Sequence, residues 1–258
     1  MRIELLGSNL DCLTMQETVA KVDEIIQAKI PVQHVVINAN KINLMQTDEK
    51  LRSIVNSSPL INADGASILL AAKMLGKKVP ERVTGIDLME EVLKLANEKA
   101  YRVFFFGATE EVVRKVVFTY SRKYPNIQIV GHENGYFDAE SSDDIAKEIR
   151  DNKADIVLVA FSSPKKEFWI HEQLENMNAP FVMGVGGSFD VVAGKTKRAP
   201  VWMQKLGCEW FYRFIQEPRR MFQRYIGGNL QFLGHVLNAK KKAGMSHAHL
   251  DDRTGRQS

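Results

Sequence analysis

Short apolar runs alternate with amphipathic stretches along most of the chain. Residues 103–106 read VFFF, and residues 155–161 read DIVLVAF. Runs of this kind, without polar alternation, are typical of strands buried on both faces of a parallel sheet. We predict five such strands, at residues 34–39, 101–106, 127–130, 155–161 and 181–185.

Residues that start helices stand between these runs. The sequences TMQE at 14–17 and TGID at 84–87 have the spacing of a capping box. The pair SP at 163–164 predicts an N-cap followed by proline at the first helical position. Strands that alternate with helices predict an α/β fold, a Rossmann-like layered domain with a mainly parallel sheet, over residues 1–195.

The chain changes character after residue 195. Residues 195–242 hold eleven Lys and Arg against two Glu, a net charge of +9, whereas the whole chain carries +4 and the remainder therefore −5. Eight aromatic residues lie in the same stretch. We predict a basic, aromatic, helical appendage over residues 196–242. The polar, aperiodic sequence of residues 243–258 predicts a disordered tail.

The appendage has two features that indicate what it contacts. Its apolar residues repeat every four positions, at Trp202, Leu206, Trp210 and Phe214. One helix face is therefore expected to pack against an apolar surface of the domain or of a partner subunit. The arginines between residues 219 and 224 stand among aromatic residues, which favours contact with an anionic membrane. Nucleic acid is not an expected partner, because no recognition-helix or RNP-type motif accompanies the charge.

Other functional classes are disfavoured by motifs that the sequence lacks. Cys12 and Cys208 stand far apart, the histidines are scattered, and no Asp-x-Asp or similar metal motif occurs. We therefore predict neither a metal site nor a cofactor. The N-terminal sequence lacks the pattern of a signal peptide, and no run of eighteen apolar residues occurs that could span a bilayer. A cytoplasmic location is the simplest interpretation.

Loops at the predicted carboxyl ends of strands are candidates for a binding site, because open α/β sheets bind ligands at that edge. These loops contain Asn38, Asp64, Gly107 and the SSPKKE sequence at 162–167. A further loop, GVGGS at 184–188, can hold a phosphate on its backbone N–H groups. It lacks the full spacing of a dinucleotide-binding loop.

Three polar residues of these loops each have two interpretations. Asp64 either caps the helix that follows it, the commoner role, or acts as a general base toward a substrate hydroxyl. Arg82 is either a solvated arginine before a helix cap or a fork that clamps a diphosphate. Asn38 either bonds local backbone at a strand end, again the commoner case, or contacts a ligand. The spacing alone does not decide between them.

Several long motifs, in order, resemble those of the WecG/TagA/CpsF glycosyltransferases. They are NADGAS at 62–67, ERVTGIDL at 81–88, SSPKKEFWI at 162–170 and GVGGSFDVVAGKTKRAP at 184–200, followed by EWFYR and EPRR. The resemblance covers roughly residues 3–235. It implies a bacterial enzyme that moves a sugar from a UDP-sugar to an acceptor on undecaprenyl diphosphate, with inversion and without a metal.

The resemblance also implies a biological setting and a set of substrates. Enzymes of this family build cell-surface polysaccharides or teichoic acids, and the implied donor sugar is N-acetylmannosamine or its uronic acid. A glucosyltransferase of exopolysaccharide synthesis in the same family remains an alternative. The protein is then expected to lie peripherally on the inner face of the cell membrane.

Residue roles follow from motif position. Asp64 inherits the role of catalytic base, and Arg82 inherits stabilisation of the departing diphosphate. The substrate-binding residues so predicted are Asn38, Gly65, Asp87, Gly107, Lys165, Gly186 and Gly187. Contact with the membrane or the acceptor is assigned to Arg213, Arg219, Arg220 and Arg224.

Two residues depart from the family pattern. Val36 stands where many teichoic-acid members have Thr, and Lys166 stands where the family usually has Gln. Both are expected to line the site, so the donor sugar stays open. A function of another class, a non-catalytic regulator that binds nucleotide sugars, also stays open, as does self-association.

Overall fold

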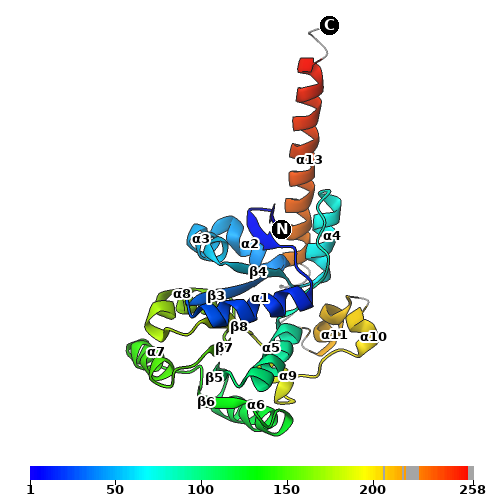
Figure 1. Ribbon diagram of the computed structural model, residues 1–258. Helices are drawn as coiled ribbons and strands as arrows, with labels where there is room; N and C mark the ends of the chain where they lie inside the picture. Colours follow the sequence, from blue (N-terminus) through cyan, green and yellow to red (C-terminus); the bar gives the residue numbers. More distant parts are fainter. Residues whose placement is uncertain (206, 217, 219–226, 255–258) are drawn as a thin grey trace.

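The computed structural model describes residues 1–205, 207–216, 218 and 227–254 (Figure 1). A six-stranded parallel sheet forms its centre, in the order β4-β3-β8-β7-β5-β6. The strands are β3 (Val32–Ile37), β4 (Leu60–Ala63), β5 (Arg102–Gly107), β6 (Gln128–Glu133), β7 (Ile156–Ala160) and β8 (Phe181–Gly184). This arrangement confirms the predicted α/β layered fold.

Helices cover both faces of the sheet. On one face lie α1 (Met15–Ala28), α5 (Gly85–Lys99), α6 (Glu110–Lys123) and the short α9 (Ser188–Val192). On the other lie α2 (Ala39–Thr47), α3 (Glu49–Ser57), α4 (Ala66–Met74), α7 (Ser142–Asp151) and α8 (Lys165–Met177). A 3₁₀ turn at Ala139–Ser141 precedes α7, and an antiparallel hairpin, β1 (Arg2–Leu5) and β2 (Ser8–Asp11), packs beside β4.

Side chains of the central strands alternate between the two layers. In β5, Val103 and Phe105 enter the core of one face, whereas Phe104 and Phe106 enter the core of the other. All four side chains are fully buried. Because both faces are covered, each position of such a strand must be apolar, and this explains the continuous apolar runs.

Among the described residues, further helices follow the sheet domain. They are α10 (Val201–Lys205), α11 (Glu209–Gln216) and α13 (Gly228–Thr254). The first turns of α13 pack on α2 and α4 through Phe232 and Val236, after which the helix extends away from the body (Figure 1). Among the described residues, no helix is long and apolar enough to cross a membrane.

The structure differs from the sequence-based expectations in several places. The predicted stripe of Trp202 and Trp210 does not form one packed helix face, because the chain turns at Gly207 (φ +71°) between α10 and α11. Trp202 is 62% exposed and Trp210 is 46% exposed. Helix α13 also continues to Thr254, through residues for which the sequence predicts no regular structure.

Two helix starts show how well the cap patterns worked. Thr14 and Glu17 form the predicted capping box, with the Thr14 side chain accepting from the Glu17 N–H at 3.2 Å. The Ser163-Pro164 pattern was wrong by one position. Pro164 is itself the N-cap of α8, and the Ser163 hydroxyl instead donates to Glu167 Oε1 at 3.1 Å.

Candidate active site

A cavity of about 610 Å³ opens at the carboxyl edge of the sheet. The loops after β3, β4 and β8, the loop before α5 and the first turn of α8 form its walls, and residues of α11 and α13 complete them. Six of the predicted site residues line it: Asn38, Asp64, Gly65, Arg82, Gly186 and Gly187. The cavity lies at the carboxyl ends of β3, β4 and β8, and open parallel sheets bind their ligands at this edge.

Asp64 stands at the tip of the loop after β4. Its backbone N–H donates to the carbonyl of Ile37 at 2.8 Å, which ties the loop to the end of β3. The N-cap of α4 is Gly65, at φ +108°, so Asp64 stands one residue before the cap position. The carboxylate lies in the cavity wall, where a general base would meet a substrate hydroxyl.

Asn38 bonds local backbone, as the commoner of its two interpretations predicts, and its contact with a ligand stays a prediction. It is the N-cap of α2, and its Oδ1 accepts from the Lys41 N–H at 3.0 Å. It also lines the cavity beside the residues of the β4 loop. The cap bond fixes the side chain at the end of β3, so its position in the site is set by local backbone chemistry.

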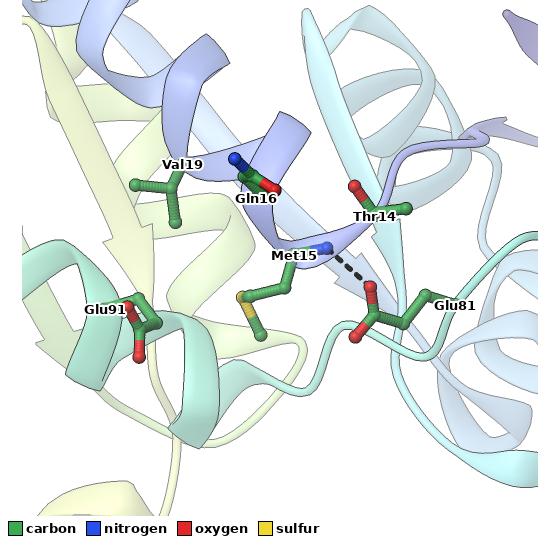
Figure 2. Close-up of a pocket in the computed structure, with 6 residues that line it drawn as sticks. All are labelled: Thr14, Met15, Gln16, Val19, Glu81 and Glu91. Atoms are coloured by element: carbon green, nitrogen blue, oxygen red, sulfur yellow. Dashed lines mark hydrogen bonds between the residues drawn. The ribbon is translucent and has the colours of Figure 1, made fainter.

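Arg82 lies in a loop that is anchored on both sides of it. The Val83 N–H donates to the carbonyl of Ala63 at 2.9 Å, and Glu81 Oε2 accepts from the Met15 N–H at 2.8 Å. Figure 2 shows Glu81 reaching the start of α1. Arg82 Nη2 donates to the carbonyl of Gln204 at 3.2 Å, which links the site to the end of α10. The planar guanidinium has five N–H donors, so this bond leaves donors for a diphosphate.

A second hollow, of about 470 Å³, lies beside Glu81. Figure 2 shows the six residues that line it. Its walls come from the start of α1, from α5 and from Glu81, and none of the predicted site residues lines it. Within it, Glu81 accepts the Met15 N–H and thereby anchors the Arg82 loop to the start of α1.

The glycine-rich loop after β8 forms the floor of the cavity. Gly186 adopts φ +56°, a left-handed conformation that favours glycine, and Gly187 is the N-cap of α9. A Cβ atom on Gly184 would lie 2.7 Å from Cδ of Lys166, so the absence of a side chain there makes room for that lysine. The loop brings backbone close to the cavity, as phosphate binding requires.

Three predicted binding residues do not line the cavity. Lys165 places its ammonium 5.1 Å and 4.9 Å from the ring centres of Phe137 and Phe161. Gly107 (φ +115°) lies against β7, where a Cβ would come within 2.9 Å of the Ala160 backbone. Its glycine is explained by packing between strands.

Asp87 is the third of these residues. Its Oδ2 accepts from the Thr84 hydroxyl at 2.6 Å, and its Oδ1 pairs with Arg198 Nη2 at 2.6 Å. Arg198 Nε also lies 3.7 Å from Glu209 Oε1 in α11. Asp87 therefore joins the start of α5 to the first residues of the appendage.

The cavity also contains residues that the binding-site prediction did not select. Lys166 lines it in place of the neighbouring Lys165, and Val36 lines it from β3, as expected of both departures from the family pattern. Successive residues of a helix point about 100° apart, so only the precise start of α8 decides which lysine faces the cavity. The sequence does not fix that start to one residue.

The basic residues assigned to the membrane or acceptor are only partly placed. Arg213 belongs to α11, whereas Arg219, Arg220 and Arg224 lie outside the described residues. Within the described ranges, no cluster of three or more His, Cys, Asp or Glu is arranged to hold a metal ion.

Comparisons with known proteins agree with this geometry. The sequence profile of the glycosyl transferase WecG/TagA/CpsF family matches residues 3–245. A Staphylococcus aureus (strain MW2) N-acetylglucosaminyldiphosphoundecaprenol N-acetyl-beta-D-mannosaminyltransferase is 32% identical over 247 residues, covering 93% of this chain and 94% of that protein. The Bacillus subtilis (strain 168) protein of the same name is 37% identical over 173 residues, 67% of each chain. The chain therefore belongs to the WecG/TagA/CpsF family of glycosyltransferases.

Proposed function

We propose that this enzyme transfers N-acetylmannosamine or its uronic acid from a UDP-sugar to a sugar on undecaprenyl diphosphate, with inversion and without a metal. The observation that carries the proposal is that Asp64, Arg82 and the Gly186-Gly187 loop line one cavity. A base, a diphosphate clamp and a phosphate-binding loop are the parts that such a transfer needs. The acceptor follows from the names of the relatives from Staphylococcus aureus and Bacillus subtilis.

The reaction assigns a role to each of these parts. The Asp64 carboxylate takes the proton of the acceptor hydroxyl, whose oxygen attacks the anomeric carbon from the face opposite UDP. The bond between that carbon and the diphosphate oxygen breaks, and UDP leaves with the electron pair. The charge that develops on the diphosphate is stabilised by Arg82 and by backbone N–H groups of the glycine loop. The anomeric configuration inverts because attack and departure occur on opposite faces.

The surface around the cavity supports a lipid-bound acceptor. Large apolar side chains on the described parts of α4, α10, α11 and α13 are exposed: Leu70, Val201, Trp202, Trp210, Phe211, Ile215, Leu230, Leu233 and Leu237. Two of them, Leu70 and Trp210, also line the cavity. Part of the exposed apolar surface therefore borders the site, which supports entry of the acceptor sugar from a membrane at Leu70 and Trp210.

A panel of UDP-sugars tested against a short-chain lipid diphosphate bearing N-acetylglucosamine would examine the proposal directly. The expected result is transfer from UDP-N-acetylmannosamine or UDP-N-acetylmannosaminuronic acid, a product of inverted anomeric configuration, and a rate that EDTA leaves unchanged. Loss of transfer with EDTA and its rescue by Mg²⁺ or Mn²⁺ would contradict the metal-independent mechanism. Binding of UDP-sugars without any transfer would instead favour a regulator.

A further inference from the structure

Three charged residues form a cluster behind the cavity wall. Lys41 Nζ lies 2.6 Å from Glu167 Oε1, and both side chains are only 2% exposed. Lys166 Nζ lies 3.7 Å from the same oxygen, and the Ser163 hydroxyl donates to it at 3.1 Å. Burial alone would raise the pKa of Glu167, but the two lysines and these hydrogen bonds lower it below its ordinary value. The carboxylate is therefore ionised and holds both ammonium groups near it.

The cluster joins the first turns of two helices, α2 and α8, across the middle of the sheet. Lys41 belongs to α2, which follows β3, and Glu167 belongs to α8, which follows β7. Strand β8 lies between β3 and β7, so the ion pair bridges over the carboxyl end of β8. The Gln33 side chain adds a bond to the Glu167 carbonyl at 3.1 Å. Loss of one partner of a buried ion pair lowers the free energy of unfolding strongly, so the pair holds the starts of α2 and α8 at a fixed spacing.

The path of the Lys166 side chain leads from this cluster into the cavity. Its stem crosses Gly184, where an added Cβ would lie 2.7 Å from Cδ and 3.0 Å from Cε. Its ammonium reaches the glycine-rich loop, 3.6 Å from where a Cβ on Gly186 would stand. Lys166 is among the residues that line the cavity, although its side chain is only 11% exposed. Glutamine, the usual family residue here, is neutral.

We propose that Lys166 binds an anionic group of the donor, an inference that rests on the proposed function. A lysine ammonium is a compact point charge, and in a partly desolvated wall it favours an anion over a hydroxyl. The carboxylate of a uronic sugar and the diphosphate of the nucleotide are the two sources of such a group.

Binding measurements with three ligands separate these sources. We would measure the Kd of UDP, UDP-N-acetylmannosamine and UDP-N-acetylmannosaminuronic acid by calorimetry, for the wild type and for Lys166→Gln. The two sugar nucleotides differ in the carboxylate at C6. If Lys166 binds that carboxylate, the substitution weakens the uronic donor by roughly 10- to 100-fold relative to the neutral one, the size of a lost charged hydrogen bond. If it binds the diphosphate, all three ligands weaken by a similar factor.

The matched control is Lys147→Gln, which removes the same charge from the exposed face of α7. Affinities of Lys166→Gln that stay within threefold of the wild type for all three ligands would overturn the inference. Thermal unfolding of each variant checks that the fold is intact. Turnover is measured separately. A wild type that binds these ligands but transfers no sugar contradicts the proposed function. The comparison of Kd values between the wild type and Lys166→Gln still tests whether Lys166 binds an anionic group.

Discussion

The carboxyl edge of the sheet and the C-terminal helices α10 and α11 differ in how their side chains are held. At the sheet edge, polar residues are held by hydrogen bonds and an ion pair: Asn38 by its helix cap, the Arg82 loop by Glu81 and Val83, and Lys166 by Glu167. On α10 and α11, apolar side chains such as Trp202 remain exposed. In the proposed function, the first region carries out the chemistry on the donor and the second receives the lipid-bound acceptor.

Two kinds of contact between described residues join the two regions. Arg198 pairs with Asp87 and Arg82 donates to the Gln204 carbonyl, whereas Phe232 and Val236 of α13 pack against α2 and α4. The polar contacts orient α10, and the apolar contacts fix the start of α13 on the body. The predictions below separate the contributions of the two regions.

The largest effect is expected from Asp64→Asn. The amide keeps the size of the side chain but cannot accept the acceptor proton, so kcat should fall by roughly 10²- to 10⁴-fold. UDP affinity and the unfolding midpoint should stay close to those of the wild type. Steady-state rates, calorimetry and thermal unfolding would measure the three quantities. A kcat near that of the wild type would remove Asp64 from the chemistry.

Arg82→Ala should have the next largest effect. Its charge matters most as the diphosphate departs, so kcat should fall more than donor affinity, by roughly 10²-fold or more. Comparison of kcat with the Kd of the UDP-sugar would measure this difference. A change confined to KM would make Arg82 a uniform binding residue instead.

Reversing charge in the appendage should separate acceptor delivery from chemistry. Each basic residue near an anionic surface contributes about 1 kcal/mol, so replacing Arg219, Arg220 and Arg224 by Glu should cost a few kcal/mol of vesicle affinity at low salt. Transfer to a long-chain lipid acceptor should fall with it. Co-sedimentation with vesicles of anionic lipid would measure the binding.

The control for this prediction reverses the same charge on the body, at Lys94, Lys147 and Lys153. These residues are exposed on the α/β domain. Vesicle binding that falls equally in both variants would indicate a general effect of net charge. Binding that is unchanged in the appendage variant would make that segment a packing or oligomer element.

The sequence predicts the buried part of the fold well because strands covered on both faces must be apolar throughout. Strand β4 was not predicted, because it has only four residues and contains Asn62, a polar residue that is fully buried. Asn62 is satisfied by His34 and Thr18, which lie 28 and 44 residues away in sequence. Contacts over such a separation leave no local pattern.

The site residues were predicted largely from motifs, and not every predicted residue lines the cavity. Asp64, Arg82, Asn38 and the glycine loop line the cavity as expected. Asp87 belongs to the same motif as Arg82, but it faces Arg198. A motif fixes which residues occur together and leaves open which of them face the ligand. That choice depends on side-chain direction, which the start of each helix determines.

The last prediction concerns the stability of the body, not its activity. His34 is fully buried, and burial lowers its pKa to about 4, opposed by its hydrogen bond with Asn62. The imidazole is therefore neutral in the folded protein. Its Nε2 lies 2.9 Å from Asn62 Oδ1, and its Nδ1 has no partner among the described residues. In the unfolded chain, the same histidine takes up a proton near pH 6.5.

This difference gives the direction of the pH dependence. Above pH 6.5 the histidine is neutral in both states, and its full contribution to stability is present. Below that pH the unfolded state binds the proton first, so the free energy of unfolding falls toward pH 4, by up to about 3 kcal/mol. Denaturant unfolding between pH 7 and pH 4 would measure it. The variant His34→Gln, which keeps a donor but does not titrate, should show a shallower decline, and an equal decline in both proteins would assign the acid sensitivity to other groups.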